Sequence, residues 1–303
     1  ELVQGDHAEE HDAHAAHDRA GCGKNTNIHR YQEVALYSVM NNRGFMFDLE
    51  PFFSQITDYD ITFVGESHDH RECQEAELEV LKGLWDKDPG IVLALEMFER
   101  DVQPVLDDYL AGVISEKTFL DSSRPWPGYS EQYRPLVEFA RTRSIPVVAA
   151  NIPRRAASAV AKAGEISAEV LAEDSVFLPP VIHVDSEEYY ERFKDIVGGM
   201  HPAGPMMNKS VDGLFKAQVL KDAVMAASLE PYLGRRILFC CGRFHSDHHL
   251  GIPYQLHKNH PELKIAVMTF GFMLEDAPMT ERSRVGDYIW IVDELSRATG
   301  PDM

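Results

Sequence analysis

The sequence predicts an α/β fold: a mainly parallel central sheet flanked by helices, with a smaller helical cap. The chain has 303 residues and is 44% apolar, which is enough to bury a core of that size. From residue 31 onward short apolar runs alternate with stretches of helical periodicity, as in sheets whose parallel strands are joined by helices. Two of these runs break at a glycine into the same tetrad, Gly-x-x-His, at residues 65–68 and 242–245. Each tetrad is typical of a buried strand that delivers a histidine to the edge of a sheet.

The elements follow one another in a regular order. Strands are predicted at residues 61–64, 91–96, 145–149, 237–241, 264–270 and 287–292. Helices are predicted at residues 70–85, 103–110, 131–143, 154–162, 187–197 and 210–227; in the first of them, Leu78, Leu81 and Leu84 recur at helical spacing. Residues 122–134 and 198–208 are predicted as loops, the first rich in aromatics and proline and the second in glycine, proline and methionine. The cap is expected at about residues 164–208.

The first 27 residues differ from the rest of the chain. They are polar and carry His7, His11, His14 and His17, at spacings that would place all four imidazoles on one side of a helix. Such a segment could collect a metal loosely, but its composition favours a disordered tail. We therefore expect a histidine-rich tail over residues 1–27 and one α/β domain over residues 28–303.

Charge and chain ends restrict the partners. With 29 basic and 49 acidic residues the formal net charge is −20, which disfavours binding to nucleic acid. The chain begins at Glu1 rather than Met, so we expect a processed form, and peripheral membrane attachment through the processed N-terminus is one of the expectations. Of the four cysteines, Cys240 and Cys241 end an apolar run and are interpreted as core thiols.

Acidic and histidine side chains are predicted at the carboxyl ends of the strands, where ligand sites of parallel sheets lie. Glu66 and His68 alternate in the first tetrad, Glu96 ends the next strand, and His245 closes the second tetrad. Two carboxylates and two imidazoles suit general acid–base catalysis or a divalent metal site. The structural alternative is that the two glutamates pair with Arg243 or Arg154 in a buried network that orients the loops.

Two further groups of residues lie near the same predicted edge. Gln218, Asp222 and Met225 share one face of the helix at 210–227, so they either line the cleft or face solvent. Asn151 and Arg154 flank a strand-to-helix turn, where they could bind an anionic group or cap the helix.

The two predicted loops contain candidate haem ligands. Tyr129, Tyr133 and His201 carry atoms that ligate haem iron in other proteins, while Met206 and Trp126 could pack on a porphyrin face. Taken singly, each tyrosine or methionine here is more often a packing residue.

Several motifs resemble those of the ChaN-type haem-binding lipoproteins, in the expected order over roughly residues 45–270. They are Gly-Glu-Ser-His-Asp-His from residue 65, Ala-Leu-Glu-Met-Phe from 94, Trp-Pro-Gly-Tyr from 126, Ala-Ala-Asn-Ile-Pro-Arg from 149, Ala-Gln from 217 and Cys-Gly-Arg-Phe-His from 241. This family is similar in turn to the erythromycin esterases and the Tiki-type proteases.

The resemblance implies a cofactor, a partner and a location. It implies an α/β fold with a parallel core sheet, haem bound between the subunits of a homodimer, and a role in haem or iron uptake in the periplasm or attached to the cell envelope. The alternative function is a hydrolase, esterase- or protease-like, in which His68 or His245 acts on water directly or through a divalent metal held with Glu66 and Glu96. A third alternative is a non-catalytic interaction domain that keeps the cleft.

Overall fold

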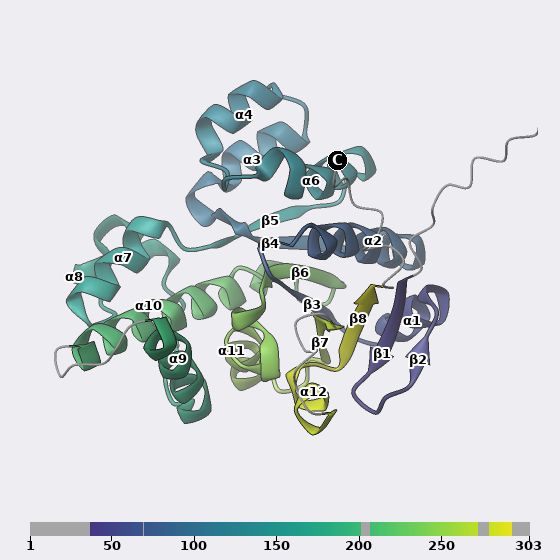
Figure 1. Ribbon diagram of the computed structural model, residues 1–303. Helices are drawn as coiled ribbons and strands as arrows, with labels where there is room; N and C mark the ends of the chain where they lie inside the picture. The colour runs from purple at the N-terminus through teal and green to yellow at the C-terminus, as the bar shows by residue number, and fades with distance from the viewer. Residues whose placement is uncertain (1–36, 69, 201–206, 272–278, 293–303) are drawn as a thin grey trace, which may run out of the picture. The chain divides into compact units, whose positions relative to one another are not determined.

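A single sheet organises the part of the chain that the computed structural model describes, which comprises residues 37–68, 70–200, 207–271 and 279–292 (Figure 1). Its strands follow the spatial order β2-β1-β8-β7-β3-β6-β4-β5. The parallel strands are β3 (Ile61–Glu66), β4 (Val92–Glu99), β5 (Val147–Asn151), β6 (Ile237–Gly242), β7 (Ile265–Phe270) and β8 (Tyr288–Val292). At one edge, β1 (Tyr37–Asn41) runs antiparallel to β8, and β2 (Met46–Phe47) runs antiparallel to β1.

Helices connect these strands. The α-helices are α1 (Leu49–Ile56), α2 (Arg71–Lys87), α3 (Gln103–Leu110), α4 (Glu116–Ser123), α5 (Tyr129–Gln132), α6 (Arg134–Arg143), α7 (Arg154–Ala163), α8 (Ala168–Leu171), α9 (Glu187–Met200), α10 (Met207–Ala227), α11 (Ile252–Asn259) and α12 (Met279–Val285). The 3₁₀ helices are η1 (Arg100–Val102), η2 (Ala172–Phe177), η3 (Glu230–Tyr232), η4 (Arg243–His245) and η5 (Asp247–His249). The α/β fold class predicted from the sequence is confirmed.

Residues along each strand alternate between two cores, one on each face of the sheet. In β6, Leu238 and Cys240 pack with α2 and α6, whereas Phe239 and Cys241 pack with α10 and α11. Parallel strands buried on both faces need a layer of helices on each side, which explains why they read as continuous apolar runs. Cys240 and Cys241 are buried free thiols, in agreement with their interpretation as core residues, and Cys73 is a further buried free thiol.

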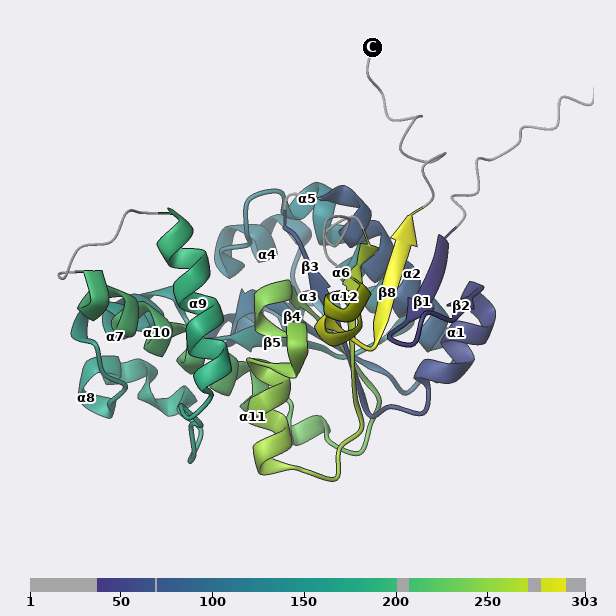
Figure 2. The same cartoon turned by 60° about the horizontal axis from the view of Figure 1, so that its bottom comes forward.

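The helical part beside the sheet consists of α7, α8, α9 and α10. Both views place α9 beside α10 (Figures 1 and 2). Leu220 and Val224 of α10 pack against α7, and Phe215 packs against Tyr189 of α9. Further along the same helix, Met225 joins the core on one face of the sheet. The long helix α10 therefore belongs both to the helical part and to the sheet layer.

The structure differs from the predicted elements at several places. The hairpin of β1 and β2 was not predicted, because β1 is only half-buried and β2 has two residues, so neither forms an apolar run. Part of the predicted loop 122–134 forms α5, and α9 and α10 extend into the predicted loop 198–208, whose residues 201–206 lie outside the described residues.

The predicted domains are only partly visible. The histidine-rich tail over residues 1–27 lies outside the described residues, and the described residues between 37 and 292 form one compact unit. Within the segment expected to form the cap lie α8, η2 and α9. In the described ranges, every helix is too short or too polar to cross a lipid bilayer.

Candidate functional site

The two Gly-x-x-His tetrads meet at the carboxyl edge of the sheet, because β3 and β6 are neighbours with Glu66 opposite Gly242. A Cβ atom at Gly65 would lie 3.0 Å from the Cα of Arg243, and one at Gly242 would lie 2.9 Å from His68 Nε2. Each glycine therefore lets the other tetrad approach more closely than a side chain would permit.

The first pair of functional groups is Glu66 and His68. His68 Nδ1 donates to Glu66 Oε1 at 2.6 Å, and the same carboxylate accepts bonds from Tyr133 Oη at 2.8 Å and Gln74 Nε2 at 2.5 Å. Glu66 is buried, whereas 42% of the His68 side chain is exposed. A fixed, buried acceptor on Nδ1 holds the imidazole with Nε2 pointing toward Gly242 and the cavity described below.

The acidic neighbours control the charge of His68. Burial lowers its pKa, but the hydrogen bond to Glu66 and the charges of Glu96 and Glu66 outweigh that effect, and the pKa is raised. His68 therefore becomes a stronger base than an isolated imidazole, while its Nε2 remains accessible.

The second pair is Glu96 and His245, and both residues are buried. His245 Nδ1 donates to Asp222 Oδ1 at 2.5 Å, and its Nε2 lies 3.2 Å from Glu96 Oε1. Gln218 Nε2 lies 3.1 Å from His245 Nδ1, and Tyr189 Oη donates to Asp222 Oδ2 at 2.8 Å. His245 thus sits between two carboxylates with both ring nitrogens engaged.

Burial and ion pairing shift the pKa values of His245 and Glu96 in opposite directions. Burial lowers the pKa of His245, but the charges of Glu96 and Asp222 and its hydrogen bonds raise it to about 10. For Glu96, burial raises the pKa, but the charge and hydrogen bond of His245 and the Gly242 N–H at 2.7 Å lower it to about 2. Glu96 and His245 therefore form a buried ion pair at neutral pH, and His245 is a fixed positive charge rather than a base.

A cavity of about 290 Å³ opens where the two pairs meet. His68, Glu96 and His245 line it together with Trp126, Arg154 and Lys221, among others. The ring of Trp126 lies edge-on to His68 at 5.0 Å between centroids, and Gln132 Nε2 donates to the backbone carbonyl of His68 at 2.9 Å. The His68 imidazole thus borders a small polar cavity, and contacts with Trp126 and Gln132 hold His68 in place.

The structure brings Glu66, His68, Glu96 and His245 together at one site, as their strand-end positions predicted; their catalytic role stays a prediction. Arg243, a partner considered from the sequence, pairs instead with Asp247 at 2.6 Å. Within the described ranges, no three His, Cys, Asp or Glu side chains converge to hold a metal ion. The reason is that these carboxylates and imidazoles bond to one another, so the predicted divalent metal gains no support.

Tyr129 and Tyr133 occupy positions that the sequence did not reveal. Tyr129 is 4% exposed and packs against Phe98 and Phe119, while Tyr133 is 1% exposed and donates to Glu66. Their assignment as iron ligands stays a prediction. His201 and Met206, the other two candidates, lie outside the described residues.

The helix α10 contributes what its periodicity suggested, and α9 adds a residue that was missed. Gln218 and Asp222 both face His245, whereas Met225 is buried against the sheet. Tyr189 donates hydrogen bonds to Asp222 and to the Phe244 carbonyl. These contacts form only because α9 packs on α10, so the sequence did not predict them. The adjacent tyrosines at 189 and 190 were the signal in the sequence, since a tyrosine in an amphipathic helix often carries a polar contact.

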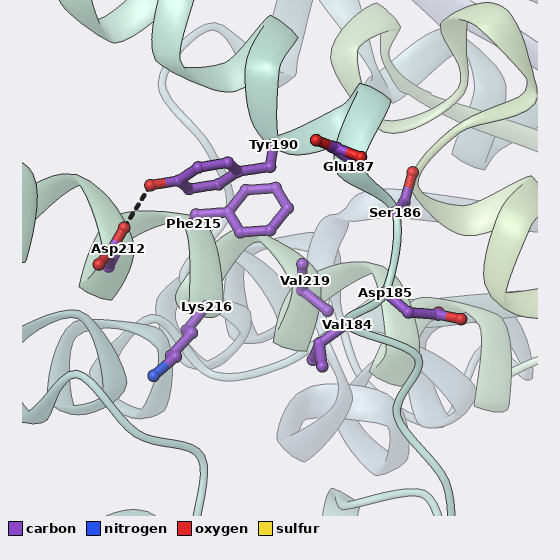
Figure 3. Close-up of a pocket in the computed structure, with 9 residues that line it drawn as sticks. All are labelled: Val184, Asp185, Ser186, Glu187, Tyr190, Asp212, Phe215, Lys216 and Val219. Atoms are coloured by element: carbon purple, nitrogen blue, oxygen red, sulfur yellow. Dashed lines mark hydrogen bonds between the residues drawn. The ribbon is translucent and has the colours of Figure 1, made fainter.

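A second cavity, of about 380 Å³, lies between α9 and α10 (Figure 3). Phe215 and Val219 line it with Tyr190, whose ring lies edge-on to Phe215 and whose hydroxyl donates to Asp212. Lys216 also lines it, with Nζ donating to the Gly164 carbonyl at 2.7 Å. The cavity thus combines an apolar wall with a tyrosine, a cation and the carboxylates of Asp185, Glu187 and Asp212.

One solved structure shares this fold, and others align with most of the chain. The structure described as cofacial haem binding to ChaN of Campylobacter jejuni matches 85% of this chain and 97% of its own, with a TM-score of 0.66 and 17% identity. An erythromycin esterase, EreC with a His-to-Asn substitution, matches 84% of this chain and 97% of its own, with a TM-score of 0.47 and 12% identity. The type III effector HopBA1 matches 81% and 93%, with a TM-score of 0.46 and 12% identity.

Comparison by sequence identifies a family but no individual curated relative. A comparison with curated proteins finds no significant match. A family model described as "Haem-binding uptake, Tiki superfamily, ChaN" matches residues 52–256 of the 303. The chain therefore belongs to the haem-binding ChaN family of the Tiki superfamily.

Proposed function

We propose that this protein binds haem in the cavity between α9 and α10. The observation that carries the proposal is a cavity of about 380 Å³ that joins an apolar wall, a tyrosine and a lysine in a chain of a haem-binding family. Haem has the matching chemistry, because its macrocycle is flat and apolar, its iron accepts oxygen ligands, and its propionates are anionic.

The residues present fit such a group. Phe215 and Val219 offer apolar surface to a porphyrin face, and Lys216 offers a cation to a propionate. Val184, at the rim, is 58% exposed, and the nearby helices expose Ile196 and Leu214 by 47% and 41%. Exposed apolar side chains on the segments that flank a cavity are suited to contact with a ligand or a second protein.

Tyr190 is the iron ligand that we propose. Its hydroxyl donates to Asp212, and this hydrogen bond, followed by burial and the charge of Asp212, raises its pKa. The hydrogen bond, rather than the pKa, places the Asp212 carboxylate where it would accept the phenolic proton if the oxygen of Tyr190 bound iron. Bound haem would supply the iron chemistry, while the protein would supply this oxygen and the apolar wall.

The proposal extends to assembly and to a biological role. The Campylobacter jejuni protein is described as binding haem cofacially, and we propose that two copies of this chain likewise face each other across bound haem, covering the exposed side chains of α9 and α10. A role in haem or iron uptake in the periplasm or at the cell envelope completes the proposal.

A haemin titration tests the binding site. Wild-type protein is expected to give a saturable shift of the Soret band, and Tyr190→Phe is expected to weaken binding and change the shape of the shifted band. Tyr129→Phe and Tyr133→Phe serve as matched controls, because each also removes one phenolic hydroxyl. A titration in which Tyr133→Phe or Tyr129→Phe loses the shift and Tyr190→Phe keeps it would favour the ligands predicted from the sequence instead.

A second candidate function is hydrolysis at the sheet edge, and a specific observation favours it. His68 Nδ1 is held by buried Glu66 at 2.6 Å while Nε2 faces the cavity, an arrangement suited to general base catalysis. In this proposal Nε2 takes a proton from water as water attacks an ester carbonyl, then returns the proton to the leaving alkoxide.

Hydrolysis of model esters tests this second function. His68→Ala is expected to abolish turnover, and Glu66→Gln to lower it by about 100-fold or more, because the imidazole loses its orienting carboxylate. Glu75→Gln, an exposed carboxylate on α2, should leave the rate unchanged. A purified protein whose esterase rate is the same with and without His68 would exclude this function.

A further inference from the structure

We propose that the cavity at the sheet edge binds a small hydroxylated molecule through an oxyanion group, either a carboxylate or a phosphate, held by Arg154 and Lys221. The two cations come from different elements, since Arg154 begins α7 and Lys221 lies on α10, yet both line the same cavity of about 290 Å³. The proposal names the substrate class of the second candidate function and rests on this cavity being a ligand site.

The acids that line the cavity are already satisfied. Glu96 is paired with His245 at 3.2 Å and accepts the Gly242 N–H. Glu99 accepts from the Arg124 guanidinium at 2.9 Å and from the backbone N–H of Arg154 at 3.1 Å. Neither carboxylate therefore needs the side chain of Arg154 or Lys221 as a partner.

The two cations, Arg154 and Lys221, lack such partners within the described residues. In the described part of the chain, neither the Arg154 guanidinium nor the Lys221 ammonium has a hydrogen bond or an ion pair. Arg154 is exposed and Lys221 is partly buried, so both can reach a ligand without giving up an internal contact. In a chain with a net charge of −20, two unpaired cations on facing elements of one cavity are suited to an anionic group.

Asn151 adds an independent sign of a ligand. It ends β5, lines the same cavity and is 7% exposed, and its Oδ1 is buried without a hydrogen-bond partner. Buried side-chain oxygens are rarely left unpaired in folded proteins, and the exceptions are often at binding sites. A hydroxyl group next to the oxyanion would donate the missing bond, so a hydroxy acid or a hydroxylated phosphate fits better than a simple acid.

Calorimetric titration of the full chain with small probes tests the inference. Inorganic phosphate, acetate and glycolate are titrated separately at constant ionic strength, which is set with sodium chloride. Saturable binding of phosphate, of the carboxylates, or of both is expected, and the stronger probe identifies the oxyanion. Glycolate should bind more tightly than acetate, because its hydroxyl group can donate the hydrogen bond that Asn151 Oδ1 lacks.

Variants connect that binding to the named residues. Arg154→Gln and Lys221→Gln should each weaken binding by about tenfold, as expected for the loss of one charge-assisted hydrogen bond. Lys117→Gln, which removes one exposed cation on α4, should bind as the wild type does. Asn151→Ala should abolish only the advantage of glycolate over acetate.

The contrary results are equally clear. Absence of saturable binding for all three probes, or equal affinity in wild type and in the Arg154→Gln, Lys221→Gln double variant, would overturn the inference. Circular dichroism of each variant separates a lost site from a lost fold. Because binding requires no turnover, a protein that binds glycolate but hydrolyses no ester would refute the second candidate function alone, and a haemin titration of the double variant should match the wild type.

Discussion

At the scale of single residues, the carboxylate of Glu66 sets the properties of His68. It is buried, it accepts from Tyr133 and Gln74 as well as from His68, and so it cannot turn away from the imidazole. Its hydrogen bond and charge contribute to the raised pKa of His68. The same residues serve either catalysis or ligand binding, because both need an oriented imidazole.

Replacing Glu66 should therefore change the titration of His68. In Glu66→Gln the pKa of His68 should fall, because burial, which lowers it, then acts against a weaker hydrogen bond and less negative charge. Nuclear magnetic resonance titration of the ring protons, assigned with His68→Gln, measures the change. Glu75→Gln, the exposed carboxylate of α2, should leave the titration as it is, and a His68 pKa unmoved by Glu66→Gln would show that Glu66 does not control the imidazole.

His245 should link stability to pH. Its pKa rises from 6.5 to about 10 on folding, so its contribution is complete below pH 6.5 and disappears as the pH rises through 10. His245→Gln leaves Glu96 and Asp222 buried without their cation and should cost about 3–5 kcal/mol at pH 6. Urea denaturation from pH 6 to pH 10 should show this difference shrinking with pH.

A surface pair provides the control for that experiment. His260 lies 2.8 Å from Glu230 in a partly exposed pair, so His260→Gln should cost about 1 kcal/mol or less. A loss for His245→Gln that stays constant from pH 6 to pH 10 would contradict the ion pair.

At the scale of elements, the strands β3, β6 and β4 form the frame of the sheet-edge site. Their neighbouring carboxyl ends place Glu66, Gly242 and Glu96 side by side, and Gly242 leaves room for His68. Gly242, the last residue of β6, therefore contributes to the site by leaving space that any other residue would fill with a side chain.

An alanine at that position tests this role. Gly242→Ala places a Cβ 2.9 Å from His68 Nε2 and should displace the imidazole, at a cost of about 1–3 kcal/mol in the free energy of unfolding. Chemical denaturation and the His68 ring signals measure both effects. Gly271→Ala is the matched control, because its nearest neighbour is 3.4 Å away, and identical results for the two variants would refute close packing of the tetrads.

The elements also show what the sequence could predict. Strands buried on both faces, such as β3 and β6, produce apolar runs and were predicted, whereas half-buried β1 was not. The strand-end residues Glu66, His68, Glu96 and His245 were found because parallel strands end at the same edge of a sheet. Tyr189 was missed and Tyr133 was interpreted as a loop ligand, because their contacts depend on how one helix packs against another element.

At the scale of the whole described unit, α10 connects the two cavities. Phe215, Lys216 and Val219 line the cavity beside α9, while Asp222 holds His245 and Lys221 lines the sheet-edge cavity. One helix thus supplies part of the wall of the proposed haem site and of the sheet-edge cavity. The two sites share an element but none of the residues that line them, so substitutions can be assigned to one or the other.

Resonance Raman spectroscopy of the haemin complex tests the claim that haem binds beside α9 with Tyr190 as the iron ligand. The wild type and Tyr133→Phe are expected to show the vibrational modes of an iron-bound tyrosinate, and Tyr190→Phe is expected to lack them. Tyrosinate modes that persist in Tyr190→Phe, or that are absent from the wild-type complex, would contradict the claim.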